Sequence, residues 1–356
     1  MTDRISTGGL MSMVAWRIMT EFLAVKPGEE VVILTDSESD ADYAHALAGA
    51  ANAIGADANI IIQPPSFLGD RERLISKAAL AAISNCDVYV AQTATTGHSV
   101  HDKDIAELYI GQKKIRMYVG GGWHGGGMLG ALDSMRNHDY SVVTEISKKL
   151  AAIMTEGNEI HVTTKAGTDF WASIKDINYY IDAGYAHDPG TVCNLPAGEA
   201  WGGPREFTAE GVIAVDGAIP MGIFPRPINP EPVILHLEKG RVVKVEGGEG
   251  ADGIRNLITN HKDGDVLAEF SLGTNPFIIL NGDCNHNDKK LYGTCHVALG
   301  HNSFQIYPHG TISTDVHTDM VVLRPTVEVD GKLVVKDGQP LGMKPIDIWR
   351  LTESLS

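Results

Sequence analysis

The 356-residue chain is 43% hydrophobic and 21% charged, and its formal net charge at pH 7 is −16. That length is more than one ordinary hydrophobic core holds, so we expect two domains. The negative net charge argues against nucleic acid as a partner, since phosphate binding needs a basic surface. The sequence contains no stretch of about eighteen apolar residues, so no membrane-spanning helix is predicted.

The first part of the chain alternates strand-like apolar runs with helical patterns. Strands are predicted at residues 29–36, 59–65, 86–93 and 114–122, and helices at 40–56, 70–85 and 140–157. Alternation of this kind is typical of an α/β layer with a mostly parallel sheet. We therefore expect an N-terminal α/β domain over residues 1–156.

Beyond residue 157 the pattern changes to short strands. Residues 158–174 alternate with period two, glycine and proline become dense between 184 and 232, and further short apolar runs follow. One helix is predicted, at 250–261. These features predict a C-terminal β-rich domain with a mixed or antiparallel sheet over residues 157–356.

The cysteines and the amino-terminal segment help to predict the cellular compartment. The four cysteines are scattered without Cys-x-x-Cys spacing, which indicates reduced thiols and neither a disulfide framework nor a zinc finger. The amino-terminal segment contains acidic residues and no clear small-residue cleavage site, so it is not predicted to be a signal peptide. We expect a cytoplasmic protein.

Acidic and imidazole side chains in the second half recur at strand ends or beside glycines. They are Glu199, Glu269, His296, His317 and Asp319. His317 and Asp319 are two apart in a predicted strand, so both point to the same side. Such groups suit Zn, Mn, Co or Fe(II), and five of them are enough for two metals. The spacing of these residues does not show that they lie close together in space. Each of them, taken alone, could also be an ordinary exposed residue of a strand or turn.

Several segments around these residues resemble a known family. The segments NLPAGEA, AEFSLGTNP, GTCHVALG and HTDMVVLRPTVEVDG resemble, in the same order, those of the thermophilic metallo-aminopeptidases (aminopeptidase T and relatives). The resemblance implies that the five residues are metal ligands, that the β-rich domain carries the site, and that the protein is a homodimer. The tyrosine that the aminopeptidases carry seven residues after the GTxH histidine is Ser303 here, with Tyr307 nearby.

The sequence is also similar, more distantly, to the 2,5-dihydroxypyridine 5,6-dioxygenases, which share this fold. VTTKAGTDF and DAGYAHDPG resemble their segments, and His98 matches a histidine that they use near the substrate. The Fe(II) ligands implied by this resemblance are His296, His317 and Asp319, a two-histidine, one-carboxylate triad. Asn194 stands where those enzymes have a second active-site histidine, and Glu199 where they have an apolar residue.

These residues and resemblances predict one of two enzyme functions, each on a small-molecule substrate. The first, favoured by the surplus Glu199 and Glu269, is a hydrolase of the aminopeptidase T type that acts on an amide or peptide-like molecule through metal-activated water, with one or two Zn, Mn or Co ions. In it, His98 and Asp169 are candidate catalytic residues, although Asp169 also fits a turn residue. The second is a ring-cleaving, extradiol-type dioxygenase of a hydroxylated N-heterocycle, with one Fe(II) and His98 as acid or base. A non-catalytic metal-binding homologue is the remaining alternative.

Two other segments contain candidate residues. GGGWHGGGM, residues 120–128, resembles a phosphate loop but lacks the GxxxxGK[ST] pattern, so we interpret it as a mobile loop from which Trp123 and His124 reach the site. CNHNDKK, residues 284–290, is interpreted as a hairpin loop rather than a third metal site.

Overall fold

The computed structural model describes most of the chain. The described residues are 5–65, 67–68, 71–72, 75–94, 102–120, 127–220, 223–282, 287–303 and 309–343. None of the helices in this part of the chain is long and apolar enough to span a membrane.

The chain divides into two compact units. The first comprises Met1–His138 and Gly184–Ala197, and the second comprises Asp139–Ala183 and Gly198–Ser356. This division differs from the boundary expected at residue 157. Helix α6 (Ser141–Glu156) belongs to the second unit, because Leu150 and Met154 are part of that unit's hydrophobic core. The chain then returns to the first unit, where β10 (Val192–Asn194) joins the sheet.

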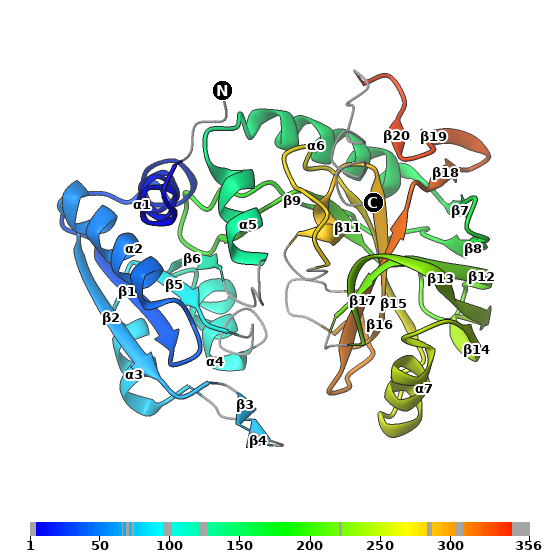
Figure 1. Ribbon diagram of the computed structural model, residues 1–356, viewed down its shortest axis with the longest axis horizontal. Coiled ribbons are helices and arrows are strands. Elements are labelled where there is room, and N and C mark those ends of the chain that lie inside the picture. Colours follow the sequence, from blue (N-terminus) through cyan, green and yellow to red (C-terminus); the bar gives the residue numbers. More distant parts are fainter. Residues whose placement is uncertain are drawn as a thin grey trace. The chain divides into compact units, whose positions relative to one another are not determined.

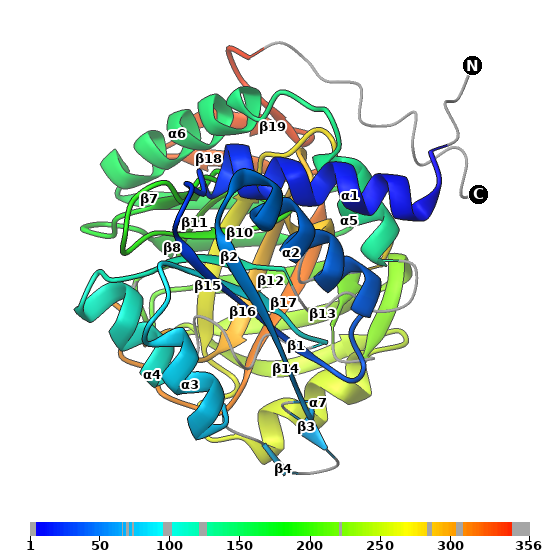
Figure 2. The same ribbon diagram turned by 90° about the vertical axis from the view of Figure 1, so that its left-hand side faces the viewer.

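The first unit is built on a five-stranded sheet in the order β10–β6–β5–β1–β2; Figure 1 labels β1, β2, β5 and β6, and Figure 2 labels β10. The other strands are β1 (Glu30–Asp36), β2 (Asp57–Gln63), β5 (Val88–Gln92) and β6 (Arg116–Val119). All four neighbouring pairs run parallel. β1 and β5 are almost continuous apolar runs, as expected for central parallel strands that are buried on both faces. The predicted N-terminal α/β layer is confirmed.

Helices and short turns complete the first unit. They are α1 (Thr7–Arg17), η1 (Ile18–Phe22), α2 (Ala41–Ile54), α3 (Lys77–Ile83), α4 (Lys103–Ala106), η3 (Glu107–Gly111) and α5 (Gly127–Met135), with a small hairpin of β3 (Phe67–Leu68) and β4 (Arg71–Glu72). α1 and α2 lie side by side (Figure 2). The Asp40 carboxylate caps α2 by accepting from the Tyr43 N–H at 3.0 Å. The helix predicted from residue 70 begins only at Lys77, with Ser76 as its N-cap.

The second unit contains two antiparallel sheets (Figure 1). The eight-stranded sheet has the order β14–β13–β12–β8–β7–β18–β19–β20, and the five-stranded sheet has the order β17–β16–β15–β11–β9. The strands of the larger sheet are β7 (Glu159–Thr163), β8 (Asp169–Ser173), β12 (Glu210–Ile219), β13 (Phe224–Glu238), β14 (Arg241–Gly247), β18 (Thr326–Val329), β19 (Lys332–Lys336) and β20 (Gln339–Pro340). Those of the smaller sheet are β9 (Tyr180–Asp182), β11 (Glu199–Gly202), β15 (Leu267–Gly273), β16 (Thr294–Gly300) and β17 (His317–Leu323).

Apolar side chains from both sheets form one hydrophobic cluster. Phe170 of β8 and Phe270 of β15 meet edge to face, with their ring centroids 6.0 Å apart. Helix α7 (Ala251–Asn260) matches the helix predicted at 250–261, and the single turn η4 (Asp288–Lys290) precedes β16. The predicted β-rich C-terminal part is confirmed.

Candidate metal centre

The candidate centre lies on one face of the five-stranded sheet. Glu269 of β15, Ala298 of β16 and Asp319 of β17 are directly paired across three neighbouring strands. Directly paired residues point to the same side of a sheet, and so do residues two apart along a strand. His296 and His317 are each two residues from this row. All four polar side chains therefore project from the same face.

The middle strand contributes little side-chain bulk between these groups. Ala298 places only a methyl group between Glu269 and Asp319. Gly300, which pairs with His317, has φ of 100°, and a Cβ atom there would lie 2.3 Å from the Val316 carbonyl oxygen. Because no side chain fits at Gly300 and only a small one is present at Ala298, the carboxylates and imidazoles are able to approach one another.

Glu269 lies between the two imidazoles. Its Oε1 atom is 2.9 Å from His296 Nε2, and its Oε2 atom is 3.3 Å from His317 Nε2. The Ser271 hydroxyl donates a further hydrogen bond to Oε1 at 2.8 Å. Glu269 lies in a fully buried, largely apolar strand, where an ionised carboxylate needs partners, and the structure supplies three.

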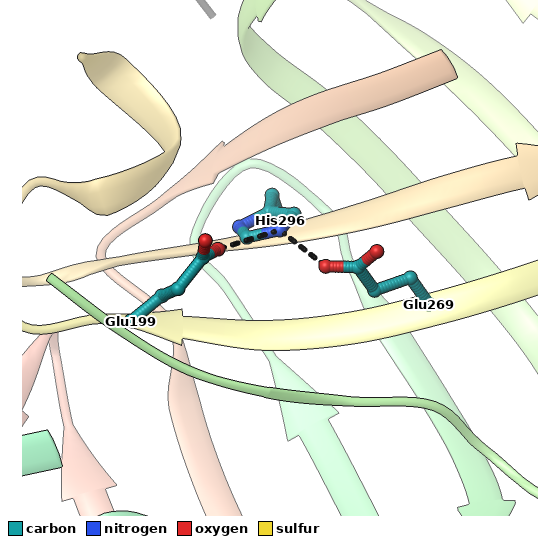
Figure 3. Close-up of side chains that lie close together, drawn as sticks. All are labelled: Glu199, Glu269 and His296. Carbon is teal, nitrogen blue, oxygen red and sulfur yellow. Dashed lines mark hydrogen bonds and ion pairs between the residues drawn. The ribbon is translucent and has the colours of Figure 1, made fainter. Parts of the chain in front are cut away.

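The other two carboxylates approach the same imidazoles. Asp319 Oδ1 is 3.3 Å from His317 Nε2, and Glu199 Oε2 is 3.5 Å from His296 Nε2. Figure 3 shows His296 between Glu199 and Glu269, which come from β16, β11 and β15 respectively. The structure therefore brings all five predicted ligands together in one cluster.

Both imidazoles are held by backbone carbonyl groups. His296 Nδ1 is 3.2 Å from the Lys289 carbonyl oxygen, and His317 Nδ1 is 2.7 Å from the His301 carbonyl oxygen. A carbonyl oxygen only accepts, so each Nδ1 carries the hydrogen. The Nε2 atom of each neutral ring is then the one that can bind a metal, as in metal sites whose histidines are oriented by an outer hydrogen bond.

The electrostatics of the cluster favour ionised carboxylates. Burial raises the pKa of Glu269, but hydrogen bonds from His296 and His317 outweigh it and hold that pKa well below its usual range. Burial likewise raises the pKa of Asp319, and Lys289 and His317 more than offset it. Burial lowers the pKa of His317, yet Asp319 and Glu269 raise it to about 10. His317 thus holds a proton that a bound cation would displace, since imidazole binds metals in its neutral form.

Two lysines of η4 also reach the cluster. Lys289 Nζ is 3.2 Å from Asp319 Oδ2 and 3.9 Å from Glu199 Oε2. Lys290 Nζ is fully buried, 2.7 Å from Asp182 Oδ2 and 3.7 Å from Glu199 Oε1. The segment 284–290 was interpreted from sequence as a hairpin loop, so these cations were missed. The adjacent lysines beside an aspartate were the signal in the sequence.

Asp169, a candidate catalytic residue, does not join the cluster. It lies on β8 in the other sheet, where its carboxylate accepts from His161 Nε2 at 2.9 Å and is 60% exposed. Its neighbour Phe170 points into the core against Phe270, so Asp169 points to the opposite, outer face. His161 is stacked on Trp171 on that outer face. The structure thus does not bring Asp169 to the other candidate residues, and its carboxylate is hydrogen-bonded to His161 on the outer face instead.

Several other candidate residues lie outside the described residues. They are His98, Trp123, His124 and Tyr307. Ser303 is described, and its backbone N–H donates to the Ile312 carbonyl at 3.2 Å. Asn194 lies on β10 in the first unit.

The donor set of the cluster fits a divalent metal ion. Glu199, Glu269 and His296 each offer a ligand atom within 4.8 Å of the others, and so do Glu269, His317 and Asp319. Glu199 Oε2 is buried and accepts no hydrogen bond from the described part of the chain. Imidazole nitrogen and carboxylate oxygen together suit Fe(II), Mn, Co and Zn.

The chain is similar to several known proteins. The family model for 2,5-dihydroxypyridine 5,6-dioxygenase (NicX) matches residues 12–342. Among curated proteins, the 2,5-dihydroxypyridine 5,6-dioxygenase of Pseudomonas putida KT2440 is 26% identical over 199 residues, which are 52% of this chain and 55% of that protein. The chain thus spans about half the length of that relative in the alignment.

Two solved structures share the fold. The 2,5-dihydroxypyridine dioxygenase from Pseudomonas putida KT2440 has a TM-score of 0.77 at 19% identity, over 96% of this chain and 99% of that chain. AmpT from Thermus thermophilus has a TM-score of 0.67 at 16% identity, over 94% of this chain and 100% of that chain. At these identities the matches show a common fold and no more.

These comparisons overturn the hydrolase that the sequence had favoured. The family model and the curated relative both name a dioxygenase, whereas the likeness to AmpT is one of fold. The hydrolase was favoured because Glu199 and Glu269 exceed the needs of a one-metal triad. In the structure Glu199 has two lysine ammonium groups beside it, so its presence alone does not indicate a second metal.

Proposed function

The chain belongs to the 2,5-dihydroxypyridine 5,6-dioxygenase family, and from this premise we propose that it is an Fe(II)-dependent dioxygenase that cleaves the ring of a hydroxylated N-heterocycle. The name of the curated relative makes 2,5-dihydroxypyridine the first substrate to test. The reaction would place both atoms of one O₂ molecule in the ring-opened product.

One observation carries the proposal. Two imidazoles, each oriented by a backbone carbonyl, direct Nε2 toward Glu269, and Asp319 lies beside one of them. We propose that His296, His317 and Asp319 hold the iron, with Glu269 as a further donor between the imidazoles. Two histidines and a carboxylate are the ligands typical of non-haem Fe(II) oxygenases.

The protein's part is to hold the ion and to set the charge around it. When bound, Fe(II) supplies the one-electron chemistry that O₂ needs to react with a closed-shell ring. The carbonyls of Lys289 and His301 keep a hydrogen on each Nδ1, and the Ser271 hydroxyl orients Glu269. The carboxylates are almost completely buried, so water does not screen their attraction for the cation.

His98 remains a proposal from the resemblance, as the acid or base that exchanges a proton with the substrate. The variant His98→Asn is expected to lower kcat by roughly 100-fold or more, because general acid–base catalysis contributes about that much. Its iron content should stay at the wild-type level. The control is His45→Asn, which replaces an exposed histidine on α2. An unchanged kcat contradicts the role, and a loss of iron would make His98 a ligand instead.

Oxygen uptake tests the proposed reaction. The chain is purified without air and without chelator, loaded with Fe(II), and mixed with 2,5-dihydroxypyridine and related hydroxylated pyridines in an oxygen electrode. We expect one O₂ consumed for each ring lost, measured as the decrease of the pyridine absorbance. Hydrolysis of amide or peptide substrates by the Zn-, Mn- or Co-loaded chain, without oxygen uptake on any pyridine, would contradict the proposal.

A further inference from the structure

The two lysines of η4 divide the carboxylate oxygens of the centre into two groups. Both oxygens of Glu269 and Oδ1 of Asp319 face imidazole Nε2 atoms. Oδ2 of Asp319 faces the Lys289 ammonium and Oε1 of Glu199 faces the Lys290 ammonium. Oε2 of Glu199 lies between the two kinds of group, 3.5 Å from His296 Nε2 and 3.9 Å from Lys289 Nζ. The imidazoles therefore leave room for a metal ion beside Glu269, and protein cations already lie against Glu199 and Asp319.

The Lys289 ammonium lies between two carboxylates of the cluster and supplies a positive charge there. Its Nζ atom lies between Asp319 Oδ2 at 3.2 Å and Glu199 Oε2 at 3.9 Å, and its side chain is only 11% exposed. These two carboxylates are among the five ligands that a two-metal centre would use. Of these two carboxylates, only that of Asp319 is within hydrogen-bond distance of the ammonium group, which places its positive charge beside Glu199 as well.

We propose that Lys289 takes the place of a second metal ion and thereby restricts the centre to one divalent ion. The proposal rests on the proposed function, which supplies the metal at the imidazole side. Lys289 is a positioning and specificity residue in this account, because it acts on which cations the centre accepts.

The charge balance supports this assignment. Glu199, Glu269 and Asp319 carry three negative charges, which one divalent ion and the Lys289 ammonium neutralise together. With Lys289 in place, a second divalent ion would bring this buried cluster to two net positive charges, one more than without the lysine, and uncompensated buried charge is unfavourable.

Lys290 keeps Glu199 on the lysine side of the cluster. Its ammonium group is anchored by Asp182 of β9 at 2.7 Å and also lies 3.7 Å from Glu199 Oε1. β9 pairs directly with β11, and Asp182 is the direct partner of Glu199. Glu199 is therefore held between Lys290 and Lys289, with His296 as its nearest imidazole.

The test is the number of Mn(II) ions bound per folded chain. Mn(II) is used because the same ligand types bind it and its electron paramagnetic resonance (EPR) spectrum distinguishes a single ion from a coupled pair. The full-length wild-type chain is expected to bind one Mn(II) with an uncoupled spectrum. Lys289→Met, which removes the charge but keeps an unbranched side chain, is expected to bind a second Mn(II) and to show a coupled spectrum.

Three further variants make the result specific. Lys289→Arg keeps the charge and should bind one ion. Lys289→Gln removes the charge with a polar side chain and should bind two, which covers a failure of the methionine variant to fold. Lys148→Met removes the same charge from an exposed position on α6 and should bind one. Circular dichroism confirms that each variant is folded.

The outcomes separate this inference from the proposed function. Two ions in the wild type would overturn the role of Lys289 while leaving a metal-dependent enzyme. One ion in the wild type and also in folded Lys289→Met or Lys289→Gln would overturn it as well. No ion in the wild type would overturn both this inference and the metal centre of the proposed function.

Discussion

The variant His317→Ala is expected to weaken metal binding by more than about 100-fold and to abolish turnover. Loss of an outer hydrogen-bond partner typically costs 10–100-fold in metal affinity, and loss of a ligand should cost more. His317 contacts both Glu269 and Asp319 through Nε2, so its removal also takes away the group that holds these two carboxylates together.

Competition with a chelator measures this effect directly. Fe(II) or Mn(II) affinity is compared between the wild type and His317→Ala under exclusion of air. The matched control is His236→Ala, which removes another histidine paired with a glutamate, Glu246, in the same unit. Wild-type affinity in His317→Ala, or an equal loss in His236→Ala, would contradict the role of His317 as a metal ligand.

Enlarging Ala298 is expected to block the centre without touching a ligand. Ala298→Val adds two carbon atoms in the row between Glu269 and Asp319. Overpacking of this kind costs about 1–3 kcal/mol. If the metal site bears that cost, binding weakens by roughly 5- to 150-fold, since about 1.4 kcal/mol is tenfold. We expect a large loss of metal content and of activity.

The control for this variant is the same substitution elsewhere in the unit. Ala172→Val lies on β8, buried on the same face as Phe170 and in the other sheet. Both variants should lose some thermal stability, measured by circular dichroism, but only Ala298→Val should lose metal affinity. Equal metal affinity in the two variants would show that the space above Ala298 is not where the ion lies.

Local patterns predicted much of the fold. The alternation of apolar strands and helices in the first half gave the parallel sheet, because each element there is short, contiguous and periodic. The same local rule predicted that His317 and Asp319 share a face. The alternation of buried and exposed residues along β8 also predicts that Asp169 points outward, because Phe170 and Ala172 occupy the buried positions of that strand.

Long-range features were not predictable in this way. The row of Glu269, Ala298 and Asp319 depends on the register of three strands, which no local pattern fixes. The position of Lys289 and Lys290 depends on a single helical turn before β16, in a segment without periodicity. The hydrolase was favoured from ligand residues alone because the lysines that offset the charge of Glu199 could not be placed.

The most direct test of the account is the origin of the oxygen atoms in the product. The Fe(II)-loaded chain is supplied with ¹⁸O₂ and a hydroxylated pyridine, and the ring-opened product is analysed by mass spectrometry. The account predicts that both atoms of ¹⁸O₂ appear in the product. A ring-opened product that contains no ¹⁸O from ¹⁸O₂ would contradict a dioxygenase.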